Sequence, residues 1–305
     1  MDRNYVRQLW LNAAMLVFFG ALLLIGTFND EAIAKALFSP DNIPVKVLTS
    51  TGMYPFFGSI TLFLGVLFER TLHSGHKKPV KVIFCVVCMI AFLFMGFIGG
   101  GSIADRNCLG SIFPEFNRNV PVILIFSVLL MYPLFFVGFH FAKKSDDKLL
   151  VQRIFVLLIM LLASFLLMQS LKNLFTRPRF RTAVLGYEGI GFVPWYTRFA
   201  GAAEFSELYD INADEFLSFP SGHSIMSISA SFIMPSLAWI FPKLRDRQLI
   251  LSIAGFAFGM MIMFTRMILG AHYLSDVSMG AIIGTLLSCV YAVAQMIISA
   301  KHKKQ

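Results

Sequence analysis

Charged residues are scarce in this sequence. Only 14% of its 305 residues are Asp, Glu, Lys or Arg, whereas 57% are hydrophobic. Soluble domains carry roughly a quarter charged residues, so an ordinary water-soluble globule is excluded. The chain also lacks long polar or low-complexity stretches, which excludes a disordered protein. This composition predicts an integral membrane protein.

Cysteine is scarce as well, with four residues. Cys85, Cys88 and Cys289 lie inside apolar runs and Cys108 lies in a connection, so neither a disulfide framework nor a metal-ligand cluster is predicted. Cys85 and Cys88 have the C-x-x-C spacing, but inside an apolar helix they are more typical of small packing residues. We therefore expect no metal and no cofactor.

Long apolar runs are abundant instead. Eight are long enough to cross a bilayer of about 30 Å, and they cover residues 9–28, 51–68, 82–101, 120–141, 154–175, 222–241, 249–265 and 277–299. The first is too long for a signal peptide and is interpreted as a retained helix. The predicted fold is all-α, a single membrane domain over residues 1–305 with about eight transmembrane helices.

Basic residues are distributed unevenly over the connections. Sixteen of the 26 Lys and Arg residues lie at the termini or in alternate loops. They are Arg3, Arg7, Arg70, Lys77, Lys78, Lys81, Lys143, Lys144, Lys148, Arg153, Lys243, Arg245, Arg247, Lys301, Lys303 and Lys304. The positive-inside rule assigns this side, with both termini, to the cytoplasm. The net charge of +9 is thus interpreted as a topology signal, and no nucleic-acid partner is expected.

The longest connection, residues 176–221, is predicted to be an outer-face loop. A connection of this length is usually functional or disordered. It carries four aromatic residues, Trp195, Tyr196, Phe199 and Phe205. Two interpretations are equally favoured, aromatic anchors at the membrane surface or a solvated connection.

Three polar clusters lie at the outer ends of spans, where apolar packing does not explain them. They are Lys172, Arg177, Arg179 and Arg181; Pro220, Ser221, Gly222 and His223; and Arg266, His272 and Asp276. One basic residue at a span end usually snorkels to headgroups, but basic residues are disfavoured on the non-cytoplasmic side. Lys172, Arg179 and Arg266 together suit an anion such as phosphate. For Arg177 and Arg181 a structural role is as well supported as a functional one.

The second and third clusters add further chemistry. Ser221 is a predicted N-cap and Gly222 allows close backbone approach, so this helix start favours phosphate. His223 can act as an acid near neutral pH. If the backbone is helical at the third cluster, the four-residue step brings His272 and Asp276 together. A carboxylate on one ring nitrogen leaves the other nitrogen as a nucleophile.

Over residues 172–276 the sequence resembles the type 2 phosphatidic acid phosphatase superfamily, the membrane lipid phosphatase and haloperoxidase group. That family's signature is Lys-x6-Arg-Pro, then Pro-Ser-Gly-His, then Ser-Arg-x5-His-x3-Asp. Two positions depart from it here, since Phe180 replaces Pro and Thr265 replaces Ser. Pairing Arg177 with Pro178 instead would shorten the spacing from Lys172, so Arg179 is favoured and Arg177 is interpreted as accessory.

The resemblance implies a six-helix core, to which the hairpin 82–141 adds an extra pair. It also implies that His272 attacks phosphorus to form a phosphohistidine, that Asp276 orients it and that His223 protonates the leaving oxygen. The implied phosphate-binding residues are Lys172, Arg179, Ser221, Gly222 and Arg266. No metal is required.

The predicted function is therefore a metal-independent membrane lipid phosphatase, a hydrolase of lipid metabolism acting on a phosphate or pyrophosphate monoester of a long-chain lipid. The active site is expected to face outward from a bacterial inner membrane and to act at the non-cytoplasmic leaflet. A phosphotransferase with the same site is one alternative. An anion or lipid transporter is another, although its ionisable groups would lie near the bilayer midplane. The headgroup and the oligomeric state are left open.

Overall fold

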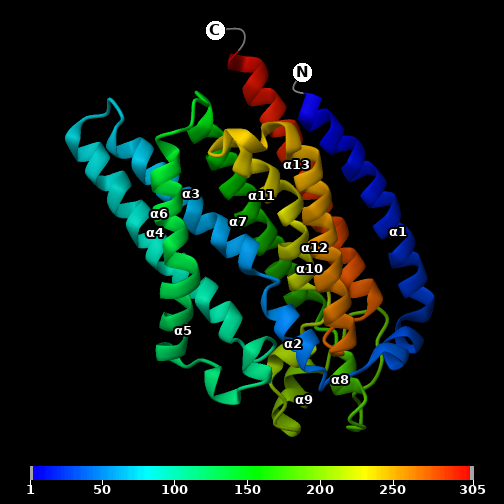
Figure 1. The fold of residues 1–305 in the computed structure, drawn as a ribbon. Helices are drawn as coiled ribbons and strands as arrows, with labels where there is room; N and C mark the ends of the chain where they lie inside the picture. Colours follow the sequence, from blue (N-terminus) through cyan, green and yellow to red (C-terminus); the bar gives the residue numbers. More distant parts are fainter. Residues whose placement is uncertain (1–2, 303–305) are drawn as a thin grey trace.

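The computed structural model describes residues 3–302, so the basic residues Lys303 and Lys304 lie outside the described part. Every regular element among the described residues is a helix, and none is a strand (Figure 1). The predicted all-α class is confirmed. Large apolar side chains such as Phe28, Ile90 and Leu129 are exposed on the outer helices, as expected for surfaces that face lipid.

Within residues 3–302, seven segments are long and apolar enough to span a membrane, which makes the chain an integral membrane protein. They are built from α1 (Arg3–Leu37), α2 (Ile43–Ser50) with α3 (Tyr54–Leu72), α4 (Lys78–Ala104), α5 (Val120–Phe126) with η3 (Ser127–Met131) and α6 (Tyr132–Ala142), α7 (Leu150–Phe175), α12 (Gln248–Ile268) and α13 (Leu274–His302).

The predicted count of eight is not reproduced, because residues 222–241 do not form one continuous helix. This stretch contains α10 (Gly222–Ile228), α11 (Ala230–Ser236) and η5 (Leu237–Trp239). Pro235 lies inside α11 and has no N–H to donate. The stretch still runs through the bundle towards the end that holds the termini (Figure 1). Its residues 221–233 are all buried, which is where membrane proteins tolerate broken helices.

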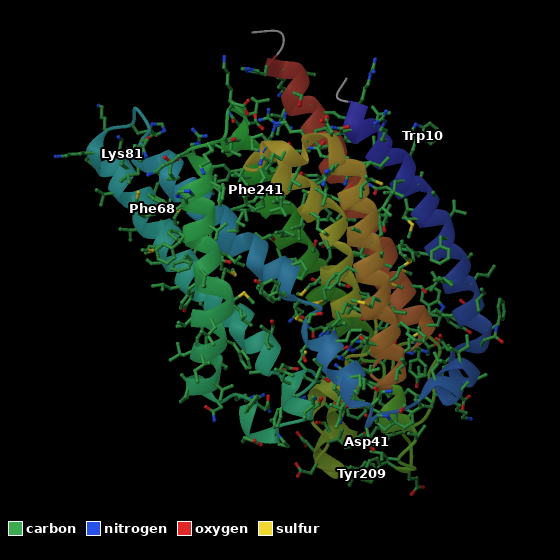
Figure 2. All side chains as sticks on the ribbon, viewed as in Figure 1. Trp10, Asp41, Phe68, Lys81, Tyr209 and Phe241 are labelled. Atoms are coloured by element: carbon green, nitrogen blue, oxygen red, sulfur yellow. The ribbon has the colours of Figure 1, made fainter. Side chains whose placement is uncertain are left out.

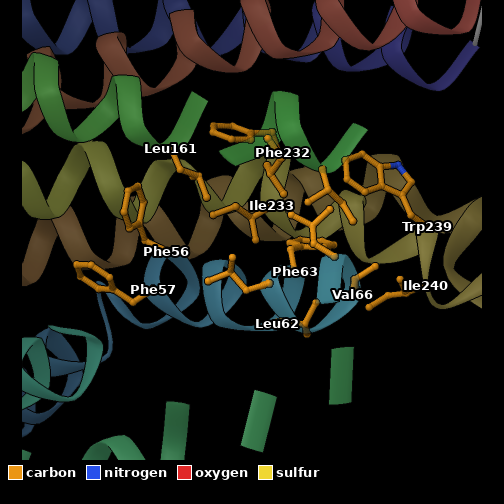
Figure 3. Packing of buried hydrophobic residues seen from close by; sticks show 14 of the residues in the cluster. Phe56, Phe57, Leu62, Phe63, Val66, Leu161, Phe232, Ile233, Trp239 and Ile240 are labelled. Carbon is orange, nitrogen blue, oxygen red and sulfur yellow. The ribbon is translucent and has the colours of Figure 1, made fainter. Parts of the chain in front are cut away.

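The helices pack as a central group with two additions. The central group contains α7, α10, α11, α12 and α13, and α1 packs along α13 and α12. On the other side α3 contacts α7, α10 and α11, and α4 and α6 pack on α3. In the core, the ring of Phe63 is fully buried and its centroid lies 5.7 Å from that of Trp239 (Figure 3). The predicted hairpin 82–141 is therefore a layer outside α3.

The two ends of the bundle differ. Both termini and the connections around residues 73–77, 143–149 and 242–247 lie at one end (Figure 1). Asp41 and Tyr209 lie at the opposite end, whereas Lys81 and Phe241 lie in the half of the bundle that carries the termini (Figure 2). The basic connections that the charge pattern grouped together are thus brought to one end of the fold.

The connection 176–221 is ordered at the other end. It contains α8 (Phe180–Ala183), α9 (Ala202–Leu208) and η4 (Ala213–Phe216). Phe199 stacks between Phe205 and Phe216, with ring centroids 5.7 and 5.8 Å away. Trp195 stacks on Phe219 at 5.5 Å, and its indole N–H donates to Thr27 Oγ1 at 2.9 Å. Three of the four aromatic residues singled out in the sequence therefore hold the connection together, and Tyr196 is the exposed one.

Candidate active site

A cavity of about 460 Å³ lies near the end of the bundle that carries connection 176–221, between α3, α4, α7 and α10. Its polar lining includes Asp105, Asn107, Gln169, Lys172, Arg179, Asp214, His223, Arg266 and His272. Its apolar lining includes Met53, Phe57, Phe97, Ile98, Phe165, Met168, Leu217 and Met226. The three polar clusters recognised in the sequence therefore meet at one cavity with a polar end and an apolar wall.

Three cations line the polar end. Lys172 lies in the last turn of α7, and its Nζ donates to the carbonyl of Leu217 at 2.8 Å. Arg179 Nε donates to the carbonyl of Asp214 at 2.9 Å. Arg266 lies in the last turn of α12 and donates to the carbonyl of Asn107 at 3.0 Å. Among the described residues no carboxylate forms an ion pair with these three, so their positive charge is available to an anion.

The start of α10 lies against these cations. Ser221 is its N-cap, and its hydroxyl accepts from the N–H of Ser224 at 3.3 Å. A Cβ added to Gly222 would collide with the sulfur of Met168 and would come within 3.4 Å of Lys172 Cε. Gly222 and His223 line the cavity, whereas Ser221 is buried behind them. The side chains of Met168 and Lys172 on α7 thus pack directly against the backbone at the start of α10.

His272 and Asp276 are not brought together within one helix, because only Asp276 belongs to α13. His272 precedes α13, and Asp276 is in its first turn. The distance from His272 Nδ1 to Asp276 Oδ2 is 3.8 Å, which is too long for a hydrogen bond. Nδ1 lies 2.7 Å from the carbonyl oxygen of Ser218, and the Ser218 hydroxyl donates to Asp276 Oδ2 at 2.5 Å. Asp276 is therefore connected to the ring through Ser218.

This arrangement defines the state of the His272 ring. A carbonyl oxygen can only accept, so Nδ1 carries the proton and Nε2 has a free lone pair in the neutral ring. Burial lowers the pKa of His272 well below its ordinary 6.5; Arg179 and Arg266 lower it further, although Asp276 opposes the shift. The ring is consequently neutral near pH 7, which is the form that a nucleophile requires.

Arg177 does not line the cavity. Its side chain is fully buried, and its two terminal nitrogens lie 2.5 Å from Asp276 Oδ1 and 2.9 Å from Asp30 Oδ2. Arg181 is occupied by Glu215, with Nε 2.9 Å from Oε2. Burial alone would raise the pKa of Glu215, but the hydrogen bond from Arg181 and the charges of Arg179 and Arg181 lower it to about 2. Of the three arginines near the first motif, Arg179 is the one that lines the cavity.

The two departures from the family signature have local explanations. Phe180 is buried, and its ring contacts Phe38 and Tyr273 edge-on at 5.2 and 5.9 Å. The ring thus packs between α8 and two aromatic neighbours from distant parts of the chain. Thr265 keeps a hydroxyl, which donates to the carbonyl of Ile262 at 2.7 Å and lies 2.5 Å from Thr49 Oγ1.

Several residues near the site were missed from the sequence. Asn107 accepts from Arg179 and Arg181 through its side chain, at 3.3 and 2.8 Å. Cys108 Sγ lies 3.6 Å from His223 Nε2. Nothing local distinguishes either residue, because both lie in an ordinary connection after α4. Asp30 was detectable, since a carboxylate at the end of an apolar run is a signal of function or pairing.

Residues 153–298 match the family model of the PAP2 superfamily. The matched range contains all three motifs, whereas Asp30, Asn107 and Cys108 lie outside it. The chain matches no curated protein and no solved structure.

Proposed function

Because this chain belongs to the PAP2 superfamily through residues 153–298, we propose that it is a phosphatase acting on a phosphate or pyrophosphate monoester of a long-chain lipid. The observation that carries this proposal is the cavity with two kinds of lining. Its polar end holds three cations without carboxylate partners, which suits a phosphate group. Its wall is apolar, which suits a hydrocarbon chain.

The apolar wall favours a lipid over a soluble phosphate ester. Phe97 and Ile98 of α4 and Phe165 of α7 line it, and Phe165 is 38% exposed on the bundle surface. A chain leaving the cavity along these residues would reach the bilayer without crossing water. Exposing each CH₂ group to water would cost about 0.8 kcal/mol, so this route stabilises a bound lipid.

The proposed reaction has two steps. Nε2 of His272 attacks phosphorus and forms a P–N bond while the P–O bond to the lipid breaks, and His223 gives a proton to the departing oxygen. Water then gives a proton back to His223 and attacks phosphorus, which breaks the P–N bond, returns the electron pair to Nε2 of His272 and releases phosphate. Phosphoryl transfer depends mainly on positioning and charge stabilisation. Lys172, Arg179, Arg266 and the N–H group of Gly222 supply these to the phosphoryl oxygens. The N–H of Ser221 already donates to the backbone carbonyl of Asp276 at 3.0 Å, so Ser221 contributes as the N-cap of α10.

The charge pattern supports an outward-facing site. The cavity is near the end of the bundle opposite the termini and the basic connections (Figure 1). With the positive-inside rule, both termini are cytoplasmic and the substrate comes from the non-cytoplasmic leaflet, in a bacterial inner membrane.

The direct test is phosphate release by the purified protein in detergent. Phosphatidate, a polyprenyl pyrophosphate and the water-soluble p-nitrophenyl phosphate are compared, each with and without a chelator. Release from at least one lipid substrate is expected, with no effect of the chelator. His272→Ala, recovered folded, should release nothing. Turnover retained in His272→Ala, or no release from any substrate by the wild type, would overturn the proposal.

A further inference from the structure

All three guanidinium nitrogens of Arg177 have protein partners. Its Nε donates to the carbonyl of Val193 at 2.7 Å, and one terminal nitrogen donates to Ser275 Oγ at 2.9 Å as well as to Asp276. Its guanidinium lies 4.0 Å from the centre of the Tyr273 ring. A side chain held on every edge and on one face cannot turn into the cavity. Arg177 therefore does not contact phosphate and serves another purpose.

Asp30 brings the first helix into the same network. It lies near the outer end of α1 and is 2% exposed. Its Oδ2 accepts from Arg177 at 2.9 Å, and its Oδ1 accepts from the N–H of Ser275 at 2.9 Å. A Cβ added to Gly26 would lie 2.7 Å from the Ser275 nitrogen. The close approach of α1 to the start of α13 thus requires glycine there and delivers the Asp30 carboxylate.

We propose that Asp30 and Arg177 form a positioning pair that holds Asp276, and through Asp276 and Ser218 the ring of His272, in the attacking orientation. The inference rests on the proposed function. It makes α1, which lies outside residues 153–298, a part of the catalytic apparatus. Asp30 and Arg177 touch neither substrate nor the reacting atoms.

The order of contacts explains how the pair acts. Asp276 receives the Arg177 guanidinium on Oδ1 and the Ser218 hydroxyl on Oδ2. The carbonyl of that same Ser218 receives His272 Nδ1. Asp30 anchors the far side of Arg177, so loss of its charge lets the guanidinium shift and turns Asp276 away from Ser218. The cations that would bind phosphate share no hydrogen bond with Asp30 or Arg177 among the described residues.

The test compares Asp30→Asn with a matched control, Glu31→Gln. Glu31 is the next carboxylate on α1, and its partner is the exposed Lys35 at 2.8 Å. Turnover of p-nitrophenyl phosphate is measured in detergent on protein shown to be folded by its thermal transition. Asp30→Asn is expected to lower kcat about tenfold with KM within about twofold of wild type, as for a group that acts only in the transition state. Glu31→Gln should match the wild type.

A double-mutant cycle separates positioning from a structural role. If Asp30 acts through Asp276, adding Asp30→Asn to Asp276→Asn should cause no further loss of kcat. Arg177→Lys is the second variant. One ammonium group cannot bridge the carboxylates of Asp30 and Asp276, so kcat should fall while KM stays unchanged. Three results would overturn the inference. The first is a folded Asp30→Asn or Arg177→Lys variant whose kcat equals that of Glu31→Gln. The others are a rise in KM with no change in kcat, and losses of kcat that multiply in the double mutant. A wild type inactive on every phosphate ester would instead overturn the proposed function.

Discussion

Replacing Ser218 by alanine tests how Asp276 acts on His272. The change removes the hydroxyl that donates to Asp276 Oδ2 at 2.5 Å and leaves the carbonyl that accepts from His272 Nδ1 at 2.7 Å. A hydrogen bond to a charged group contributes about 1.5–3 kcal/mol, or roughly 10- to 100-fold in rate if it is fully expressed in the transition state. Asp276 keeps its bonds from Arg177 and from the N–H of Tyr273. We therefore expect kcat to fall about tenfold.

The assay is steady-state release of phosphate in detergent, with kcat and KM determined separately. Ser278→Ala is the matched control, because Ser278 is also fully buried and its hydroxyl has no partner among the described residues. Its kcat should equal that of the wild type. KM should change in neither variant, since Ser218 does not line the cavity. A kcat for Ser218→Ala within twofold of Ser278→Ala would refute the connection through Ser218.

Three further predictions separate the roles of neighbouring groups. Arg179→Ala should remain folded and lose about a hundredfold in kcat/KM, as expected for about 3 kcal/mol of lost charge stabilisation. Arg177→Ala should instead lose about 3–5 kcal/mol of folding stability, because two buried carboxylates are left unpaired. Steady-state kinetics and thermal melting of each variant measure the two effects. The lowered pKa of His272 keeps the ring neutral as the pH falls through 6.5, so the acid limb of the kcat/KM profile should lie below that pH, and a limb above it would contradict the assignment. In a cysteine-free background, Glu204→Cys should react with a membrane-impermeant thiol reagent in intact cells, and Lys144→Cys should react only after permeabilisation. The reverse pattern would overturn the topology.

Most of the long helices and the polar clusters at one end of the bundle could be predicted from residues that are neighbours in the chain. A long apolar run commits its own residues to a membrane helix, so α1, α4, α7 and α13 could be predicted without knowing their neighbours. The resemblance to the family signature Lys-x6-Arg also favoured Arg179 over Arg177, and Arg179 is the one that lines the cavity. These are properties of residues close together in the chain.

How the site is held in place depends on packing between distant segments and could not be predicted from the sequence. The stretch 222–241 is apolar enough to be predicted as one span, yet it is broken. Enclosure by other helices allows the break, because the backbone groups that it frees are buried in protein and do not face lipid. Asp30 meets Arg177 across 147 positions of sequence, and the Asn107 carbonyl meets Arg266 across 159. No local pattern identifies the partner in such a contact, since a carboxylate or an amide becomes a partner only when packing brings a distant cation within hydrogen-bonding distance and excludes water from both.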